Sequence, residues 1–292
     1  MDKVSHNVTV QQLIARGARR LRRARVFFGH GTDNAWDEAA ALVWHALRLP
    51  APGARVYART VSPAAQRAAR DLIGRRIRER MPAVYLTGET WFAGLRFRVD
   101  PRALIPRSPL AELIERGFAP WIDARRVRRV LDIGTGSGCI AIATARMMPR
   151  VRVDALDISP EALDLAALNV RRHRLGRRVR LLRSDYFSAL RAERYDIIVS
   201  NPPYVGSREM RSLPPEYRHE PRQALASGAD GMDAVRAILA GARRHLNPGG
   251  VLIVEVGNTE GAVRRAFAQL PFTWLTFERG GGGVFLLGAD QL

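Results

Sequence analysis

The chain has 292 residues, a mass of 32.5 kDa and 47% hydrophobic residues, so it can bury the core of one large domain with a smaller domain beside it. No run approaches the roughly 18 consecutive apolar residues of a membrane span, and residues 1–7 lack the apolar core of a signal peptide. A single cysteine, Cys139, excludes an intrachain disulfide, and the six histidines show no metal-ligand spacing. We therefore expect a cytoplasmic protein that binds neither a structural metal nor a membrane.

The net charge of +19 predicts a surface that attracts polyanions such as nucleic acid or a ribonucleoprotein. Lys3 is the only lysine, so arginine supplies almost all of this charge. A codon bias of the source genome would produce the same skew. The charge therefore leaves both readings open, and nothing in the sequence predicts an oligomeric state.

Residues 1–83 are expected to form a small helical domain. From residue 10 to residue 80 the apolar residues recur at helical spacing in three segments. Turn signals at 29–34 and 50–53 separate these segments, and Asp33 or Asn34 is placed to cap the second helix. Next, residues 84–106 are expected to form a β-hairpin linker, because apolar residues approach alternation about Gly94.

Residues 107–292 alternate short apolar runs with helical stretches, which is typical of a doubly wound, mostly parallel sheet. The last two runs are separated only by a glycine-rich turn and predict an antiparallel hairpin that closes the sheet. The fold class is therefore α/β and Rossmann-like, with seven strands. The expected strands lie at 130–133, 151–158, 179–182, 197–199, 251–256, 272–277 and 284–287.

A glycine-rich segment follows the first of these strands and opens a helix. Glycines there allow a tight turn and a close approach to a ligand at a helix N-terminus. The spacing matches neither a dinucleotide fingerprint nor a phosphate loop, which disfavours a nicotinamide cofactor or a nucleoside triphosphate. The acid before the glycines suits a ligand with a positive charge. The candidate residues are Asp132, Gly134, Thr135, Gly136, Ser137 and Gly138.

Acidic residues end the next two strands. Asp157 is placed to accept hydrogen bonds from both hydroxyls of a ribose. Asp185 and Tyr186 are placed to hold the amine and the ring face of an adenine. The sequence therefore predicts a nucleoside-bearing ligand at the carboxyl edge of the sheet.

The fourth strand leads into Asn201-Pro202-Pro203-Tyr204. Two successive prolines stiffen this loop and remove two N–H donors, which leaves carbonyl acceptors exposed. The Asn201 side-chain oxygen and the Pro202 carbonyl could each accept one hydrogen from a planar NH₂ group, while the Tyr204 ring packs on its face. We expect a site for an amide or an aromatic amine. A proline-stiffened turn with an asparagine cap is the structural alternative.

In this order along the chain, the motifs between residues 128 and 288 resemble those of class I S-adenosylmethionine-dependent methyltransferases. That resemblance implies S-adenosylmethionine as the cofactor. The Asn-Pro-Pro-Tyr loop resembles the branch that methylates amino groups, which includes adenine and guanine amine methylases and protein-glutamine N5-methyltransferases.

Nearly the whole chain resembles the HemK-like protein-glutamine methyltransferases, which have a helical domain, a hairpin and a catalytic domain in this order. The matching segments are 85–89, 92–95, 104–107, 218–221 and 230–233. Release-factor enzymes of this family carry Pro-Arg-Pro-Glu/Asp-Thr-Glu, whereas this chain has Pro-Arg-Ser-Pro-Leu-Ala-Glu at 106–112.

In this departure the chain resembles the PrmB-type branch, whose members methylate a glutamine of the third protein of the large (50S) ribosomal subunit. It implies a ribosomal-protein partner, with ribosomal RNA nearby, and a helical domain that recognises this protein. The alternatives are a release-factor enzyme, a nucleic-acid amine methyltransferase and a non-enzymatic assembly factor that retains the fold.

Overall fold

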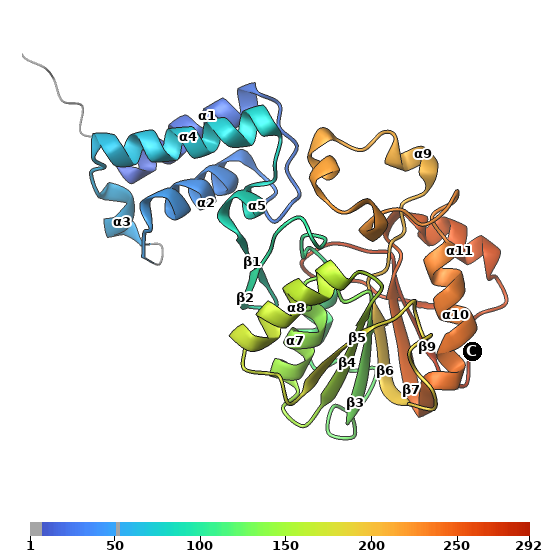
Figure 1. Ribbon diagram of the computed structural model, residues 1–292. Coiled ribbons are helices and arrows are strands. Elements are labelled where there is room, and N and C mark those ends of the chain that lie inside the picture. Colours follow the sequence, from blue (N-terminus) through green and yellow to red (C-terminus); the bar gives the residue numbers. More distant parts are fainter. Residues whose placement is uncertain (1–7, 51–52) are drawn as a thin grey trace, which may run out of the picture. The chain divides into compact units, whose positions relative to one another are not determined.

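The computed structural model describes residues 8–50 and 53–292 and divides the chain into two compact units (Figure 1). The first unit comprises the residues up to Glu89 together with Pro214–His219, and the second comprises Thr90–Leu213 and Glu220–Leu292. The expectations for residues 1–7 and for the turn at 51–52 lie outside the described residues.

The helical unit follows the periodicity of the sequence. Thr9 caps the first helix through a capping box, because its hydroxyl accepts from the Gln12 N–H (3.2 Å) while the Gln12 side chain accepts from the Thr9 N–H (3.1 Å). As predicted, Asn34 caps the second helix. Apolar faces of the three longest helices form one core, which includes Leu13, Ile14, Leu42 and Ile73. The helices are α1 (Val10–Arg23), α2 (Ala35–Leu47), α3 (Ala54–Ala58), α4 (Pro63–Glu79) and α5 (Ala83–Thr87).

A short hairpin follows, formed by β1 (Glu89–Phe92) and β2 (Leu95–Arg98). It occupies less of the chain than the expected range of 84–106. Residues 84–87 lie in α5, which begins after Pro82 and ends at Gly88 with a left-handed φ of 75°. A proline before a helix and a glycine after it terminate that helix, and the alternating pattern starts only beyond them.

The second unit contains a seven-stranded sheet in the order β5-β4-β3-β6-β7-β9-β8, and this confirms the predicted fold class. Five neighbouring strands are parallel, and β9 runs antiparallel to both β7 and β8. Ile133 at the end of the central strand lies opposite Leu156 and Ser200, so adjacent strands end at one level. The strands are β3 (Arg129–Ile133), β4 (Arg152–Asp157), β5 (Val179–Arg183), β6 (Tyr195–Ser200), β7 (Leu246–Glu255), β8 (Thr273–Trp274) and β9 (Val284–Gly288).

Helices cover both faces of this sheet, as a doubly wound fold requires (Figure 1). One apolar core joins the sheet to α6, α7 and α8, and the other joins it to α10 and α11. Short helices occupy the connections. The helices of this unit are α6 (Leu110–Glu115), α7 (Cys139–Met147), α8 (Pro160–Arg172), α9 (Ser207–Met210), α10 (Asp233–His245) and α11 (Glu260–Ala266), with the 3₁₀ turns η1 (Pro215–His219), η2 (Arg222–Ala224) and η3 (Gly257–Thr259).

The closing hairpin forms between β8 and β9 as predicted, but β8 has two residues where the sequence predicted a strand over 272–277. Two-residue pairing suffices because the aromatic rings of Phe272 and Trp274 pack on Phe285. Across residues 8–50 and 53–292, no helix is long and apolar enough to cross a bilayer.

Candidate functional site

Four loops meet at the carboxyl edge of β3, β4, β5 and β6, and they surround a cavity of about 320 Å³. Parallel strands that end at one level place the loops after them side by side. The structure therefore brings together motifs that are up to 70 residues apart in the sequence. The predicted residues that line the cavity are Gly134, Thr135, Gly136, Ser137, Asp157, Asp185, Tyr186, Asn201, Pro202 and Pro203.

The glycine-rich loop has a backbone that only glycine adopts without strain. Gly134, Gly136 and Gly138 have φ values of 72°, 55° and 80°, all in the left-handed region. The N–H of Thr135 donates to the Leu156 carbonyl (2.8 Å), which ties the loop to the neighbouring strand. This conformation exposes backbone along the cavity wall at the start of α7, as the glycine spacing predicts.

Asp132 lies beneath this loop and does not line the cavity. Its Oδ2 accepts hydrogen bonds from the Thr135 hydroxyl (2.6 Å) and the Ala141 N–H (3.1 Å), so it joins the loop to α7. The Oδ1 atom is buried and has no hydrogen-bond partner among the described residues. Burial raises the pKa of Asp132 to about 7. A buried oxygen without a partner next to a ligand cavity marks a place for a donor from outside the chain.

Asp157 ends β4 and lines the cavity. Its two oxygens accept from the N–H groups of Gly136 (2.8 Å) and Ser159 (2.9 Å), so the carboxylate also fixes the glycine-rich loop. Burial raises the pKa of Asp157. Each carboxylate oxygen can accept a second hydrogen bond from a ligand hydroxyl. The next residue, Ile158, is 52% exposed and adds an apolar surface to the same wall.

The Asp185–Tyr186 turn after β5 is held by its own serines. The Ser184 hydroxyl donates to the Tyr186 carbonyl (2.7 Å), and the Asp185 N–H donates to the Ser188 hydroxyl (3.1 Å). Tyr186 has a φ of 46°, a left-handed conformation that is uncommon for a bulky residue. Backbone strain of this kind concentrates at binding sites, where the surrounding bonds enforce it.

Asn201, Pro202 and Pro203 form the opposite wall of the cavity. Oδ1 of Asn201 is buried and accepts no hydrogen bond from any residue that the structure describes. The loop is anchored from β6, where the Ser200 hydroxyl donates to the Ile133 carbonyl (2.7 Å). A rigid loop thus presents an acceptor oxygen whose burial is unfavourable until a donor occupies the cavity.

Tyr204 does not line this cavity, which differs from the expected packing of its ring on an acceptor amine. A Cβ placed on Gly257 would lie 2.6 Å from the ring, so the ring packs directly on the backbone there. The Tyr204 hydroxyl points to Glu255 Oε1 at 3.5 Å. Glu255 is 5% exposed and also accepts from the Ser108 hydroxyl. Burial raises the pKa of Glu255 to about 7.

The remaining cavity wall comes from residues 102–108 and 221–226. Arg107 donates twice to Glu220, at 2.6 and 2.7 Å, and the same carboxylate accepts from the Ile105 N–H (3.0 Å). Sequence reasoning quoted both stretches as family segments but assigned them no role. The sequence offers only one signal for this contact, an arginine and an acid more than 100 residues apart. A sequence pattern alone does not show that the two side chains pair.

A second hollow, of about 590 Å³, lies at the amino-terminal ends of β3, β4 and β5. We call it the arginine groove. Asp154 neutralises part of its charge by binding Arg129 (3.0 Å) and Arg180 (2.8 Å). The groove is lined by Arg128, Arg129, Arg150, Arg152, Arg177, Arg178 and Arg180, together with Asp154 and Glu193. Within the described part of the chain, no three histidine, cysteine or acidic residues cluster as metal ligands.

The Rossmann-like sheet, with a glycine-rich loop and acids at its carboxyl edge, is the arrangement expected from the resemblance to S-adenosylmethionine-dependent methyltransferases. Residues 116–232 match the family model described as "Methyltransferase small domain". The ribosomal protein uL3 glutamine methyltransferases of Bordetella pertussis, Xanthomonas campestris and Neisseria meningitidis are 48%, 47% and 45% identical to the chain. Each alignment covers 97% of this chain, and the alignments cover 96%, 92% and 94% of those proteins. The chain belongs to the family of ribosomal protein uL3 glutamine methyltransferases, which confirms the predicted resemblance.

Solved structures share the fold at much lower sequence identity. The human Mettl16 catalytic domain bound to an RNA hairpin aligns over 85% of this chain and 91% of its own, with a TM-score of 0.52 and 15% identity. A methyltransferase from Pyrococcus furiosus aligns over 67% of this chain and 89% of its own, with a TM-score of 0.49 and 21% identity.

Proposed function

We propose that the protein methylates the N5 amide nitrogen of a glutamine in ribosomal protein uL3. The buried Asn201 Oδ1, which no described residue satisfies, carries this proposal. It is an acceptor on a rigid loop that lines the cavity, and an amide NH₂ group is the donor that completes it. The names of the relatives that match 97% of the chain supply the substrate.

S-adenosylmethionine supplies an electrophilic methyl group when it is bound. The residues that line the cavity fit this cofactor: Asp157 for the ribose hydroxyls, Asp185 and Tyr186 for the adenine, and residues 134–137 along its chain. Ile158 offers an apolar surface beside Asp157, which suits the face of a flat ring. The partnerless Asp132 Oδ1 below the glycine-rich loop is suited to a cationic ammonium group, directly or through water.

The protein must then orient a poor nucleophile. The lone pair of an amide nitrogen is delocalised, so the nitrogen has to be held in line with the methyl group and favoured as it becomes pyramidal. Hydrogen bonds from the NH₂ group to Asn201 Oδ1 and the Pro202 carbonyl do both, and they strengthen as positive charge develops on nitrogen. After transfer the methylated nitrogen releases one proton to solvent. Tyr204, packed on Gly257, then holds the loop in place.

Residues 1–83 are proposed to recognise the protein substrate, residues 84–106 to link the two parts, and residues 107–292 to carry out methyl transfer. The reaction is proposed to take place in the cytoplasm, where ribosomal proteins are made. The arginine groove is proposed to bind RNA phosphates near the substrate. Its support is the exposure of Arg150, Arg152 and Arg177 at the rim of the groove.

The decisive experiment incubates purified uL3 with the protein and tritiated S-adenosylmethionine, followed by peptide mass spectrometry. We expect one added methyl group on one glutamine. Asn201→Ala should lower kcat by about 100-fold or more, because one transition-state hydrogen bond is lost, while the cofactor Kd changes by less than about threefold. Asn258→Ala, an exposed asparagine that binds Glu209, is the matched control and should retain activity.

Three results would overturn the proposal. They are label on release factors but not on uL3, label that resists protease but not ribonuclease, and full turnover by the Asn201 variant. The first two would keep the cofactor site and change the acceptor. The third would show that Asn201 takes no part in methyl transfer.

A further inference from the structure

The chain between the Asn-Pro-Pro-Tyr loop and α10 forms a long loop, which we call the excursion loop (residues 205–226). Its two ends are joined by backbone hydrogen bonds in the second unit. The Val205 N–H donates to the Leu225 carbonyl (2.8 Å), and the Ser227 N–H donates to the Val205 carbonyl (3.0 Å). The middle of the loop, Pro214–His219, belongs to the helical unit by its contacts. One short segment of chain is therefore built into the other unit.

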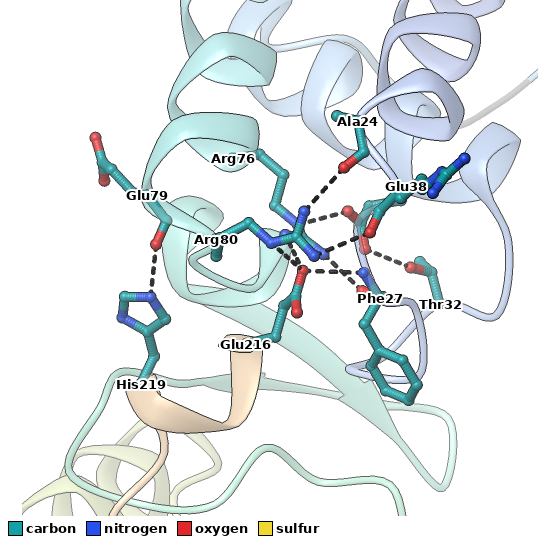
Figure 2. A network of polar contacts seen from close by, with 10 residues as sticks. Ala24, Phe27, Thr32, Glu38, Arg76, Glu79, Arg80, Glu216 and His219 are labelled. Carbon is teal, nitrogen blue, oxygen red and sulfur yellow. Dashed lines mark hydrogen bonds and ion pairs between the residues drawn. The ribbon is translucent and has the colours of Figure 1, made fainter. Parts of the chain in front are cut away.

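Glu216 anchors this middle segment. Its side chain is fully buried, and its Oε1 accepts from Arg76 Nη1 (3.1 Å) and from the Phe27 N–H (2.9 Å). Arg80 Nε lies 3.0 Å from the same oxygen. Figure 2 shows the guanidinium groups of Arg76 and Arg80 gathered at the Glu216 carboxylate.

The contacts of Glu216 belong to a cluster in which positive and negative side chains are equal in number. Arg76 is also fully buried and binds Glu38 at 2.7 Å on its other side, so two arginines meet two carboxylates. Burial alone would raise the pKa of Glu216, but hydrogen bonds from the Phe27 N–H and the Arg76 guanidinium hold it below its usual value. Removing one member of a buried ion pair leaves an uncompensated charge and is strongly destabilising. Displacing Glu216 from its partners would leave buried charges uncompensated, and this cost keeps the middle of the excursion loop in the helical unit.

The next residues of the chain form the wall of the catalytic cavity. The His219 ring bonds the Glu79 carbonyl (2.8 Å) in the helical unit, while its covalent neighbour Glu220 binds Arg107 and the Ile105 N–H in the second unit. Pro221, Gln223 and Ala224 then line the cavity. Only Glu220 separates the anchored segment from the first of the residues that line the cavity.

We propose that Glu216 is a positioning residue for methyl transfer. By fixing residues 214–219 in the helical unit, it limits the positions open to Glu220 and, through Glu220, to Arg107 and the 221–226 wall. The proposal rests on the proposed function, because the reaction to be positioned is methyl transfer to uL3. Displacing a cavity wall by about 1 Å is enough to cost up to about 100-fold in rate.

The test compares Glu216→Gln with Glu38→Gln in the full-length protein. Both variants remove one carboxylate from Arg76 at almost constant shape, but only Glu216 belongs to the excursion loop. We expect both variants to lower the Tm. Only Glu216→Gln should increase hydrogen exchange over residues 205–226 and lower kcat on uL3 by about tenfold or more, with the cofactor Kd within about threefold of wild type.

Equal losses of kcat in the two variants, or unchanged exchange and kcat in Glu216→Gln, would overturn the proposal and leave Glu216 a purely structural residue. If Glu216→Gln does not fold, His219→Ala removes the second tie of the same segment and should give the same pattern. Wild-type protein that fails to methylate uL3 would overturn the proposed function instead. The exchange comparison would still decide whether Glu216 anchors the loop.

Discussion

Glu255→Gln should flatten the dependence of stability on pH. Glu255 is 5% exposed, and its carboxyl faces Ser108, Tyr204 and the charge of Arg107. Burial raises its pKa from 4.5 to about 7. The folded protein therefore holds this proton more tightly than the unfolded chain does, and the contribution of Glu255 to stability is fully present only below the unfolded pKa of 4.5. That stability is lost as the pH rises towards 7.

The size of the effect follows from the shift. About 2.5 pH units at about 1.36 kcal/mol each give a loss on the order of 3 kcal/mol, complete above about pH 7. Glutamine has the same shape and no charge to lose. The difference in unfolding free energy between the variant and wild type should therefore change by about 2–3 kcal/mol in favour of the variant between pH 5 and pH 8.

Urea unfolding at several pH values measures this difference directly. Ser108→Ala supplies a control of opposite sign, because the hydroxyl lowers the pKa of Glu255 and its removal should deepen the loss of stability at pH 8. Parallel curves for wild type and Glu255→Gln would refute the reasoning, since they would show that Glu255 titrates alike in the folded and unfolded chains.

Asp157→Ala should weaken cofactor binding by about 10- to 100-fold, because it removes a charged acceptor and frees the Gly136 N–H. Calorimetry that gives an unchanged cofactor Kd would show that the ribose lies elsewhere. The triple change Arg150→Gln, Arg152→Gln and Arg177→Gln should reduce the slope of log K against log salt for an RNA duplex by about 2–3. Arg171→Gln, Arg244→Gln and Arg265→Gln remove the same charge from other exposed positions. An equal loss of slope in that control would show that RNA binds through the general positive charge of the protein and not through the arginine groove.

The sequence predicted the cavity because its motifs sit at strand ends. Asp157 and Asn201 come at the ends of largely buried strands, and Asp185 follows the half-buried β5. Parallel strands place such residues at one edge whatever their separation in the chain. The fold and the meeting of these loops therefore needed only periodicity and topology. Periodicity and topology do not predict the direction in which a side chain points. The Tyr204 ring packs on Gly257 rather than in the cavity.

Glu216 and Glu255 were not predicted, for one physical reason. Their partners, Arg76 and Ser108, lie 140 and 147 residues away. An acidic residue is most often exposed, and only the folded chain shows that its charge or hydroxyl partner is buried with it. Ser108 was noticed as a departure from the release-factor motif, and the structure gives that departure a partner.

The anchor at Glu216 also sets a condition on synthesis of the protein. A ribosome makes Arg76 about 140 residues before its second carboxylate, which at 5–20 residues per second is an interval of roughly 10–30 s. During this interval the emerging helical unit holds a guanidinium group with half of its final charge partners. The unit at the start of the chain is thus completed only when residues 214–219, which follow β6 of the second unit, have left the exit tunnel.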